Sequence, residues 1–163
     1  MSKASSAARA SNALSRSRAR LAAVQALYQM DMAETDLNEI IDEFKTHRLG
    51  IDAEDGAVAG ADVEHFARVL KGVVKRQLEL DPMIDQQLAT GWRLVRIDSI
   101  VRAILRAASF ELMQMPDVPV RVVISEYVEV ANAFFEGDEP KVVNGVLDQL
   151  ARKLREGELP TRG

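Results

Sequence analysis

The arginines near the start of the chain are the side chains whose type and spacing most clearly suggest chemistry. Arg16, Arg18 and Arg20 alternate with small residues. Residues 1–30 carry five basic and no acidic side chains, whereas the rest of the chain carries 16 basic and 25 acidic ones. A guanidinium group binds phosphate through two parallel hydrogen bonds. The segment therefore predicts an arm that binds a polyanion, although charge alone also fits a solvated tail.

The local setting of these arginines favours the binding arm. In a helix, Arg16 and Arg20 share one face and Arg18 projects from another. No acidic side chain lies within ten residues of any of them, and positive charge at a helix start opposes the helix dipole. We therefore expect the three guanidinium groups to serve a partner rather than the fold.

Groups for catalysis or metal binding are scarce. The chain has no cysteine, and its histidines, His47 and His65, lack the i, i+4 spacing of a zinc-binding pair. We expect two surface histidines, no metal, no cofactor and no enzyme, since no nucleophile–base pair or glycine-rich phosphate loop is present. The lack of cysteine, of a secretory signal and of a long apolar run predicts a cytoplasmic protein without a membrane partner.

Apolar residues recur at helical spacing along most of the 163-residue chain, which is 47% hydrophobic. They predict an all-α fold of about seven helices with a break near residues 90–96. Asp81 followed by Pro82 is a helix-start signal, and it predicts a separate short fourth helix. Residues 120–124 are β-branched apart from Arg121 and fit a strand, but the helical period continues to Phe134, so we predict a helix there.

The ends of the chain are expected to differ from its centre. Residues 1–15 are rich in Ser and Ala with few large apolar groups, which predicts a disordered basic extension. Residues 156–163 form a polar tail. Between them we expect one helical domain, residues 16–155, with subdomains of about 16–90 and 91–155.

Five segments resemble the bacterial antitermination factor NusB family in order and spacing. They are RARLAAVQALY at residues 18–28, AILR at 103–106 with FEL at 110–112, DVP at 117–119, ISEYVEVA at 124–131 and KVVNGVLD at 141–148. The resemblance implies two three-helix bundles with an extra helix. It also implies binding of the boxA element of ribosomal RNA operon transcripts together with NusE, a ribosomal protein, to assemble an antitermination complex on RNA polymerase.

The resemblance also implies which residues lie near RNA. The positions matching the family's RNA-binding regions are Arg16, Arg18, Arg20, Tyr28, Asp138, Lys141 and Asn144. From the residues alone, Tyr28 is either a core tyrosine, which we favour, or a platform on which a base stacks. Some family members carry phenylalanine after the lysine, whereas this chain has Val142, which puts stacking there in doubt.

A second surface must bind NusE, since RNA and protein are held together. We expect it on the outward side of the helix that contains Arg102, Arg106 and Glu111, because charge is embedded there in an apolar pattern. An internal ion pair of Arg106 is the alternative. A helical protein-interaction module without sequence-specific RNA binding is the alternative function, and the resemblance also allows a homodimer.

Overall fold

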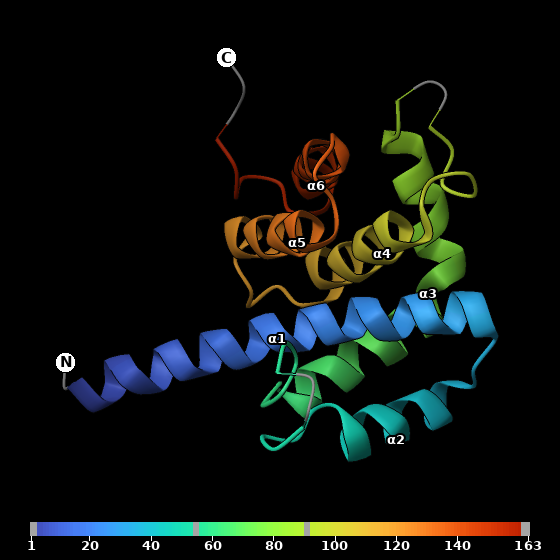
Figure 1. Ribbon diagram of the computed structural model, residues 1–163. Coiled ribbons are helices and arrows are strands. Elements are labelled where there is room, and N and C mark those ends of the chain that lie inside the picture. The colour runs from blue at the N-terminus through green and yellow to red at the C-terminus, as the bar shows by residue number, and fades with distance from the viewer. Residues whose placement is uncertain (1–2, 54–55, 90–91, 161–163) are drawn as a thin grey trace. The chain divides into compact units, whose positions relative to one another are not determined.

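The computed structural model describes residues 3–53, 56–89 and 92–160, and the regular elements in these ranges are α-helices (Figure 1). The all-α prediction is therefore confirmed, with six helices where we expected about seven. The helices are α1 (Lys3–Ala33), α2 (Leu37–His47), α3 (Val63–Gln87), α4 (Ser99–Gln114), α5 (Val120–Phe134) and α6 (Glu139–Leu154).

The chain divides into two compact units, Met1–Lys71 and Gly72–Gly163. The division falls inside α3, not near residues 90–96 as expected. The physical reason is that the two halves of this helix contribute to different cores. Phe66 stacks on an α2 ring in the first unit, while Gly72 lies against an α4 ring in the second.

Small residues of α1 and larger residues of α2 and α3 build the core of the first unit. Phe44 and Phe66 stack with ring centroids 5.3 Å apart. On α1, Ala22, Ala23 and Val24 are fully buried. Small side chains allow helix axes to approach closely, so this alanine-rich face fixes how α1 lies in its unit and which way its arginines point.

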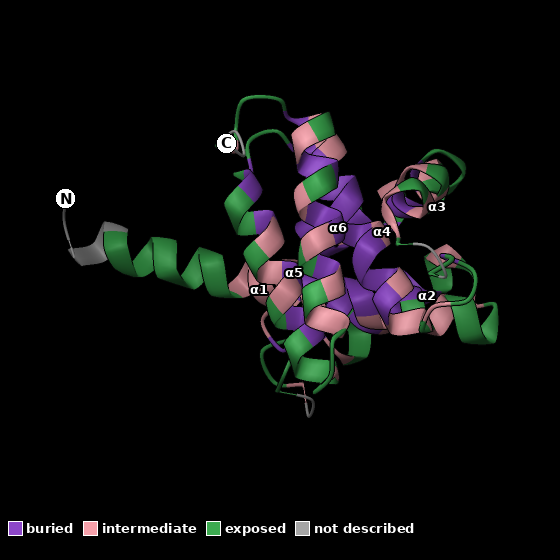
Figure 2. Cartoon of the chain, turned by 90° about the horizontal axis from the view of Figure 1, so that it is seen from above, coloured by how far each residue is buried: buried purple, intermediate pink, exposed green. Residues whose placement is uncertain are grey.

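Three mutually packed helices, α4, α5 and α6, form the core of the second unit together with the end of α3. Figure 2 shows that α4 is buried along most of its length. On α5, Val123, Tyr127 and Val130 face the core. The β-branched run at residues 120–124 is helical, as predicted, because this stripe of period 3.6 satisfies the core and a strand would not.

The expected separate helix starting at Asp81 and Pro82 is not present. Pro82 lies inside α3, which continues to Gln87. A proline within a helix removes one backbone hydrogen bond. Burial and an ion pair hold the helix together across this position. Leu80 and Ile84 are both fully buried, and Asp81 forms an ion pair with Arg106 of α4. Tertiary packing therefore overrides the local start signal.

The structure also differs from the expectation at the start of the chain. Helix α1 begins at Lys3, so residues 3–15, which we expected to be disordered, continue the helix of residues 16–33. Residues 6–14 are all exposed. Alanine has the highest helix propensity and this stretch has no Gly or Pro, so the helix can propagate backwards from its packed part without a core of its own. Residues 1–2 lie outside the described residues.

Candidate nucleic-acid interface

The three arginines of the RARLAAVQALY segment have three different surroundings. Arg16 lies 3.9 Å (Nε to Oδ2) from Asp62, and the two side chains are 41% and 31% exposed. Asp62 immediately precedes α3, so the neutralising acid comes from a distant part of the chain. A half-exposed ion pair at this distance is weak, which leaves Arg16 able to exchange Asp62 for a phosphate.

Arg18 and Arg20 are used by the fold, which corrects the expectation that all three charges serve a partner. Arg18 Nη1 donates a hydrogen bond of 2.9 Å to the carbonyl of Ala59. Arg20 is only 2% exposed. A guanidinium is buried only when the protein itself satisfies its charge and its N–H groups. Arg20 is therefore a core residue of the first unit in this structure, with no surface from which to contact RNA.

Tyr28 completes the α1 part of the predicted interface. We favoured a core role from the sequence, yet the residue is 39% exposed. Its neighbours Ala26 and Leu27 are buried, so Tyr28 lies at the edge of the buried face of α1. A tyrosine in this position can present part of its ring to solvent, as base stacking requires.

The second predicted group lies at the start of α6 in the other unit. Asp138 occupies the N-cap position but its side chain makes no capping hydrogen bond. Lys141 and Asn144 are exposed and three residues apart, so they share one helix face. This face combines a cation for phosphate with an amide that can read a base edge. Asp138 adds a carboxylate acceptor next to it.

A pair of adjacent phenylalanines at the end of α5, a few residues before α6 in the chain, is a feature that the sequence analysis missed. The residue directly after Lys141 is Val142, which is half-buried and has no aromatic ring. Phe134 ends α5 and is 39% exposed, and its ring centroid lies 6.5 Å from that of Phe135. From the sequence, Phe134 was counted in the apolar period of this helix. The adjacent phenylalanines just before a Gly-containing turn are the sequence signal that could have indicated an exposed pair.

The surface predicted for NusE is largely internal. Glu111 is fully buried, which contradicts an outward position, and it accepts a hydrogen bond from the Tyr127 hydroxyl. Arg106 forms two hydrogen bonds of 2.8 Å with Asp81, which is the alternative that we had left open. Arg102 donates to the carbonyl of Leu94 and is half-buried. A periodic apolar pattern does not reveal that the charges within it are paired inside the unit.

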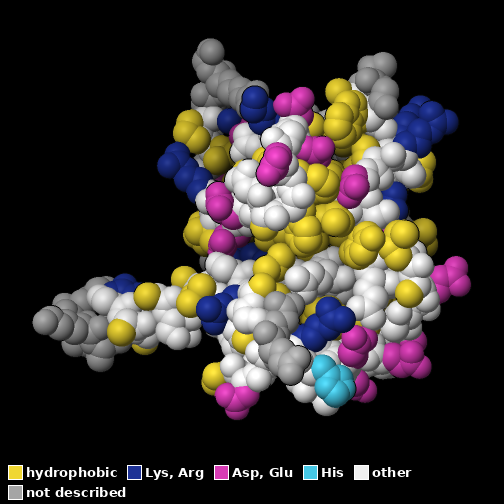
Figure 3. Space-filling model, viewed as in Figure 1, with side chains coloured by type: hydrophobic (Ala, Val, Ile, Leu, Met, Phe, Trp, Pro, Cys, Tyr) yellow, Lys and Arg dark blue, Asp and Glu magenta, His cyan; other side chains and the backbone are white. Residues whose placement is uncertain are grey.

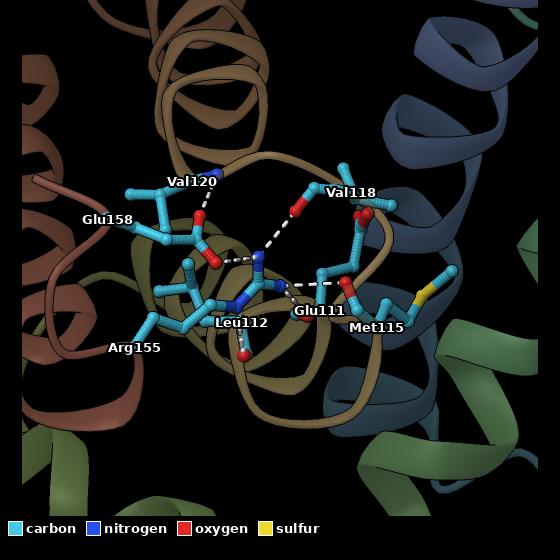
Figure 4. A network of polar contacts seen from close by, with 7 residues as sticks. All are labelled: Glu111, Leu112, Met115, Val118, Val120, Arg155 and Glu158. Atoms are coloured by element: carbon cyan, nitrogen blue, oxygen red, sulfur yellow. Dashed lines mark hydrogen bonds and ion pairs between the residues drawn. The ribbon is translucent and has the colours of Figure 1, made fainter.

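A buried arginine outside the predicted sites organises this region (Figure 4). Arg155 follows α6, is 8% exposed and donates to the carbonyls of Glu111, Leu112, Met115 and Val118 around the end of α4. The Glu158 carboxylate contacts Arg155 and accepts a hydrogen bond from the Val120 backbone. The segment that we expected to be a polar tail is thus tied to its unit as far as Pro160, whose carbonyl accepts from Arg152.

The expectation for the histidines is half correct. His47 is exposed, whereas His65 is only 3% exposed. Its backbone N–H donates to the Asp62 carboxylate in the first turn of α3. Its low exposure shows that the residue lies on the inward face of that turn. Among the described residues, no cluster of three or more His, Asp or Glu could hold a metal ion. Within the same residues, no helix is both long and apolar enough to span a bilayer.

Comparison with known proteins assigns this two-unit helical architecture to a family. By its fold, the chain is an all-α protein whose long first helix carries a cationic end. The NusB family model matches residues 17–152. Transcription antitermination protein NusB from Bartonella henselae is 54% identical over 140 residues, covering 86% of this chain and 89% of its own. The protein of the same name from Rhodopseudomonas palustris is 54% identical over 143 residues, covering 88% and 85%. The chain belongs to the NusB family.

Solved structures agree with the fold. Thermotoga maritima NusB aligns with a TM-score of 0.73 and 30% identity, covering 88% of this chain and 95% of that one. A structure of antitermination factors NusB and NusE in complex with double-stranded RNA aligns with a TM-score of 0.70 and 21% identity, covering 85% and 97%. The second likeness supports the fold alone.

Proposed function

We propose that this protein is a transcription antitermination factor that binds boxA RNA of ribosomal RNA operon transcripts together with NusE and helps to assemble the antitermination complex on RNA polymerase. The observation that carries the proposal is the family match over residues 17–152, with relatives of that name above 50% identity. It acts by binding and not by catalysis, in the cytoplasm where transcripts are made.

The proposed RNA contacts are divided between two helices. On α1, Arg16 exchanges its weak contact with Asp62 for a phosphate, and Tyr28 stacks on an unpaired base. On α6, Lys141 binds a second phosphate and Asn144 hydrogen-bonds to a base edge. Arg18 supports this surface indirectly, because it holds the α2–α3 connection through the Ala59 carbonyl.

The acidic residue at the start of α6 has a separate role in the proposal. Asp138 is exposed and its carboxylate caps no backbone N–H of its own helix. A carboxylate accepts hydrogen bonds from the amino groups of bases and repels phosphates. We assign Asp138 to base selection and not to affinity.

The proposed NusE surface must differ from the one expected from the sequence. Arg106 and Glu111 are engaged inside the second unit. Arg102 is half-buried, and it donates hydrogen bonds to the Leu94 carbonyl and the Ser99 hydroxyl, which are neutral groups. It is therefore the position at which charge reversal tests NusE binding, measured by calorimetry, and an unchanged affinity would remove α4 from the interface.

A gel shift with boxA RNA and a scrambled control, at two salt concentrations and with or without purified NusE, tests the function. We expect selective binding of boxA that NusE strengthens. The two phosphate contacts proposed above, at Arg16 and Lys141, give a log–log salt slope of about −1.4 for single-stranded RNA. Equal binding of both RNAs with NusE present would instead support a helical protein-interaction module, the alternative that the internal use of Arg18 and Arg20 favours.

The oligomeric state is a separate part of the proposal. A homodimer would cover the RNA-binding surface and dissociate when RNA is added. Light scattering with and without boxA RNA measures this directly, because a dimer that dissociates on binding is replaced by a complex with the mass of one chain plus the RNA. A mass that stays that of one chain under both conditions would exclude regulation by self-association.

A further inference from the structure

A glycine in the interior of α6 is not required by the packing of its own chain. Gly145 is half-buried and has ordinary helical backbone, since the described glycines with positive φ are Gly60 and Gly157. A Cβ built on Gly145 meets no atom of the described residues within 4 Å. Glycine in a helix interior is less stable than alanine, because it loses more backbone entropy on folding. The fold therefore keeps a destabilising residue where alanine would fit.

The glycine of α3 shows what an internal requirement looks like. A Cβ added at Gly72 would clash with the ring of Phe110, so a side chain of the same unit excludes any larger residue there. Around Gly145 the described part of the chain provides no such neighbour. The space that the missing side chain leaves at Gly145 is therefore open to a partner, which can approach the helix backbone closely.

The open position lies among the side chains proposed to bind RNA. Lys141 and Asn144 are exposed, and residues four apart are neighbours on a helix surface, so Lys141 lies beside Gly145. On the same side of α6, farther along, Arg152 Nε lies 3.1 Å from Asp148 Oδ2. We call the helix backbone at Gly145, between Lys141 and this ion pair, the bare strip.

Long-range attraction does not account for RNA binding at this helix. Figure 3 shows acidic side chains over α5 and α6 on the face drawn, and the residues after position 30 carry nine more acids than bases. The attraction of a phosphate to Lys141 is therefore opposed by acids and screened by salt, and it is strong only at short range. A helix surface without a side chain at Gly145 permits that short range.

We propose that the bare strip seats the sugar–phosphate backbone of boxA RNA, which contacts the α6 backbone at Gly145 while Lys141 binds its phosphate. The inference rests on the proposed function and deepens it. Gly145 is a positioning residue that contributes no polar group. It determines how closely the RNA approaches, and so whether the base of the same nucleotide comes within reach of Asn144.

A protein helix fits the bare strip less well than RNA does. Glycine also permits two helices to cross closely, but the core of a protein interface is depleted of charged residues. The positions beside the strip are charged or polar: Lys141, Asn144, Asp148 and Gln149. These neighbours suit a ligand that is itself polar and charged, as the RNA backbone is.

Gly145→Ala and Gly145→Leu test the proposal, because they add a side chain without removing a contact within the chain. Both replacements favour helix, so thermal unfolding should show stability equal to or above that of the wild type. The affinity for boxA RNA is measured by fluorescence anisotropy with NusE present. We expect it to fall roughly fivefold for Gly145→Ala and roughly fiftyfold for Gly145→Leu. A purely structural role of Gly145 does not produce a gain in stability together with a loss of RNA affinity.

Gly50→Ala is the matched control. It makes the same change at another open glycine, which is exposed in the loop after α2, and it should leave the affinity for boxA at the wild-type value. Lys141→Ala provides a second comparison. If one stretch of RNA backbone contacts both residues, Gly145→Leu should weaken binding less in the Lys141→Ala background than in the wild type.

Three outcomes would overturn the inference. An unchanged boxA affinity of Gly145→Leu means that no RNA lies on the bare strip. Additive effects of Lys141→Ala and Gly145→Leu mean that the two residues do not share one stretch of RNA backbone. A loss of NusE affinity in calorimetry without RNA, with boxA binding by the variant alone retained, assigns the strip to a protein. The proposed function fails separately, when the wild-type protein does not distinguish boxA from the scrambled RNA.

Discussion

Arg20 on α1 and Arg155 after α6 come from different sequence settings, and both are buried. Arg20 belongs to a segment that resembles an RNA-binding motif, yet it is 2% exposed. Arg155 precedes a polar tail, and its guanidinium is surrounded by four backbone carbonyls from the end of α4 and the α4–α5 connection. Arg16, by contrast, is half-exposed beside one acid. The role of an arginine thus depends on which distant groups surround it.

The strongest test of this comparison is Arg155→Ala. The change leaves several buried carbonyls at the end of α4 without their donor, and it frees Glu158 from its partner. We expect the free energy of unfolding to fall by about 3–5 kcal/mol, measured by urea denaturation. Lys153→Ala, an exposed change in the last turn of α6, should alter it by less than about 0.5 kcal/mol. Similar small effects for both variants would mean that water replaces the guanidinium.

The contrast within α1 gives the second test. Arg20→Ala should lower the free energy of unfolding by about 2–4 kcal/mol, because the change removes a guanidinium that is only 2% exposed together with the hydrogen bonds it makes. Arg16→Ala should change it by less than about 1 kcal/mol but weaken boxA binding. The two variants are compared by thermal unfolding and by gel shift. If Arg20→Ala is stable and weakens RNA binding, Arg20 leaves the core to bind RNA.

How far the sequence predicts this molecule depends on the kind of feature. Periodic apolar residues predicted the helix at 120–134 correctly, because burial of one face is encoded locally. The continuation of α3 through Pro82 was not predictable, since it depends on Asp81 meeting Arg106, 25 residues away. For the same reason, Arg18 could not be assigned before its contact with Ala59 was known.

The candidate site shows the same limit. Lys141 and Asn144, which the family resemblance placed near RNA, are exposed at the start of α6. The sequence prediction failed at Glu111, because the charged group lies on the buried side of α4 next to Tyr127. Whether Tyr28 and Lys141 contact RNA stays a prediction, which the binding experiments decide.

Glycines in helices extend the comparison from charge to shape. A Cβ added at Gly72 of α3 would lie 2.1 Å from Cε2 of Phe110, whereas Gly145 of α6 has nothing within 4 Å. We expect Gly72→Ala to cost about 1–3 kcal/mol through overpacking. Gly145→Ala should stabilise by up to about 1 kcal/mol, since alanine favours helix. Differential scanning calorimetry of both variants is the measurement, and a stabilised Gly72→Ala would show that the Phe110 ring moves aside freely.

The smallest expected effect concerns the ion pair between Arg106 and Asp81. The test is whether partial burial makes this pair stronger than an exposed one. The side chains of Arg106 and Asp81 are 13% and 28% exposed and form two hydrogen bonds of 2.8 Å, whereas those of Arg76 and Glu79 are 34% and 55% exposed and lie 3.2 Å apart. Double-mutant cycles to alanine should give a coupling free energy of about 1–2 kcal/mol for the first pair and about 0.3 kcal/mol for the second. The first pair joins α3 to α4, so its loss also removes the support that lets α3 continue past Pro82. Equal couplings would mean that the bidentate geometry adds nothing, and that the buried neighbours Leu80 and Ile84 alone hold the helix together there.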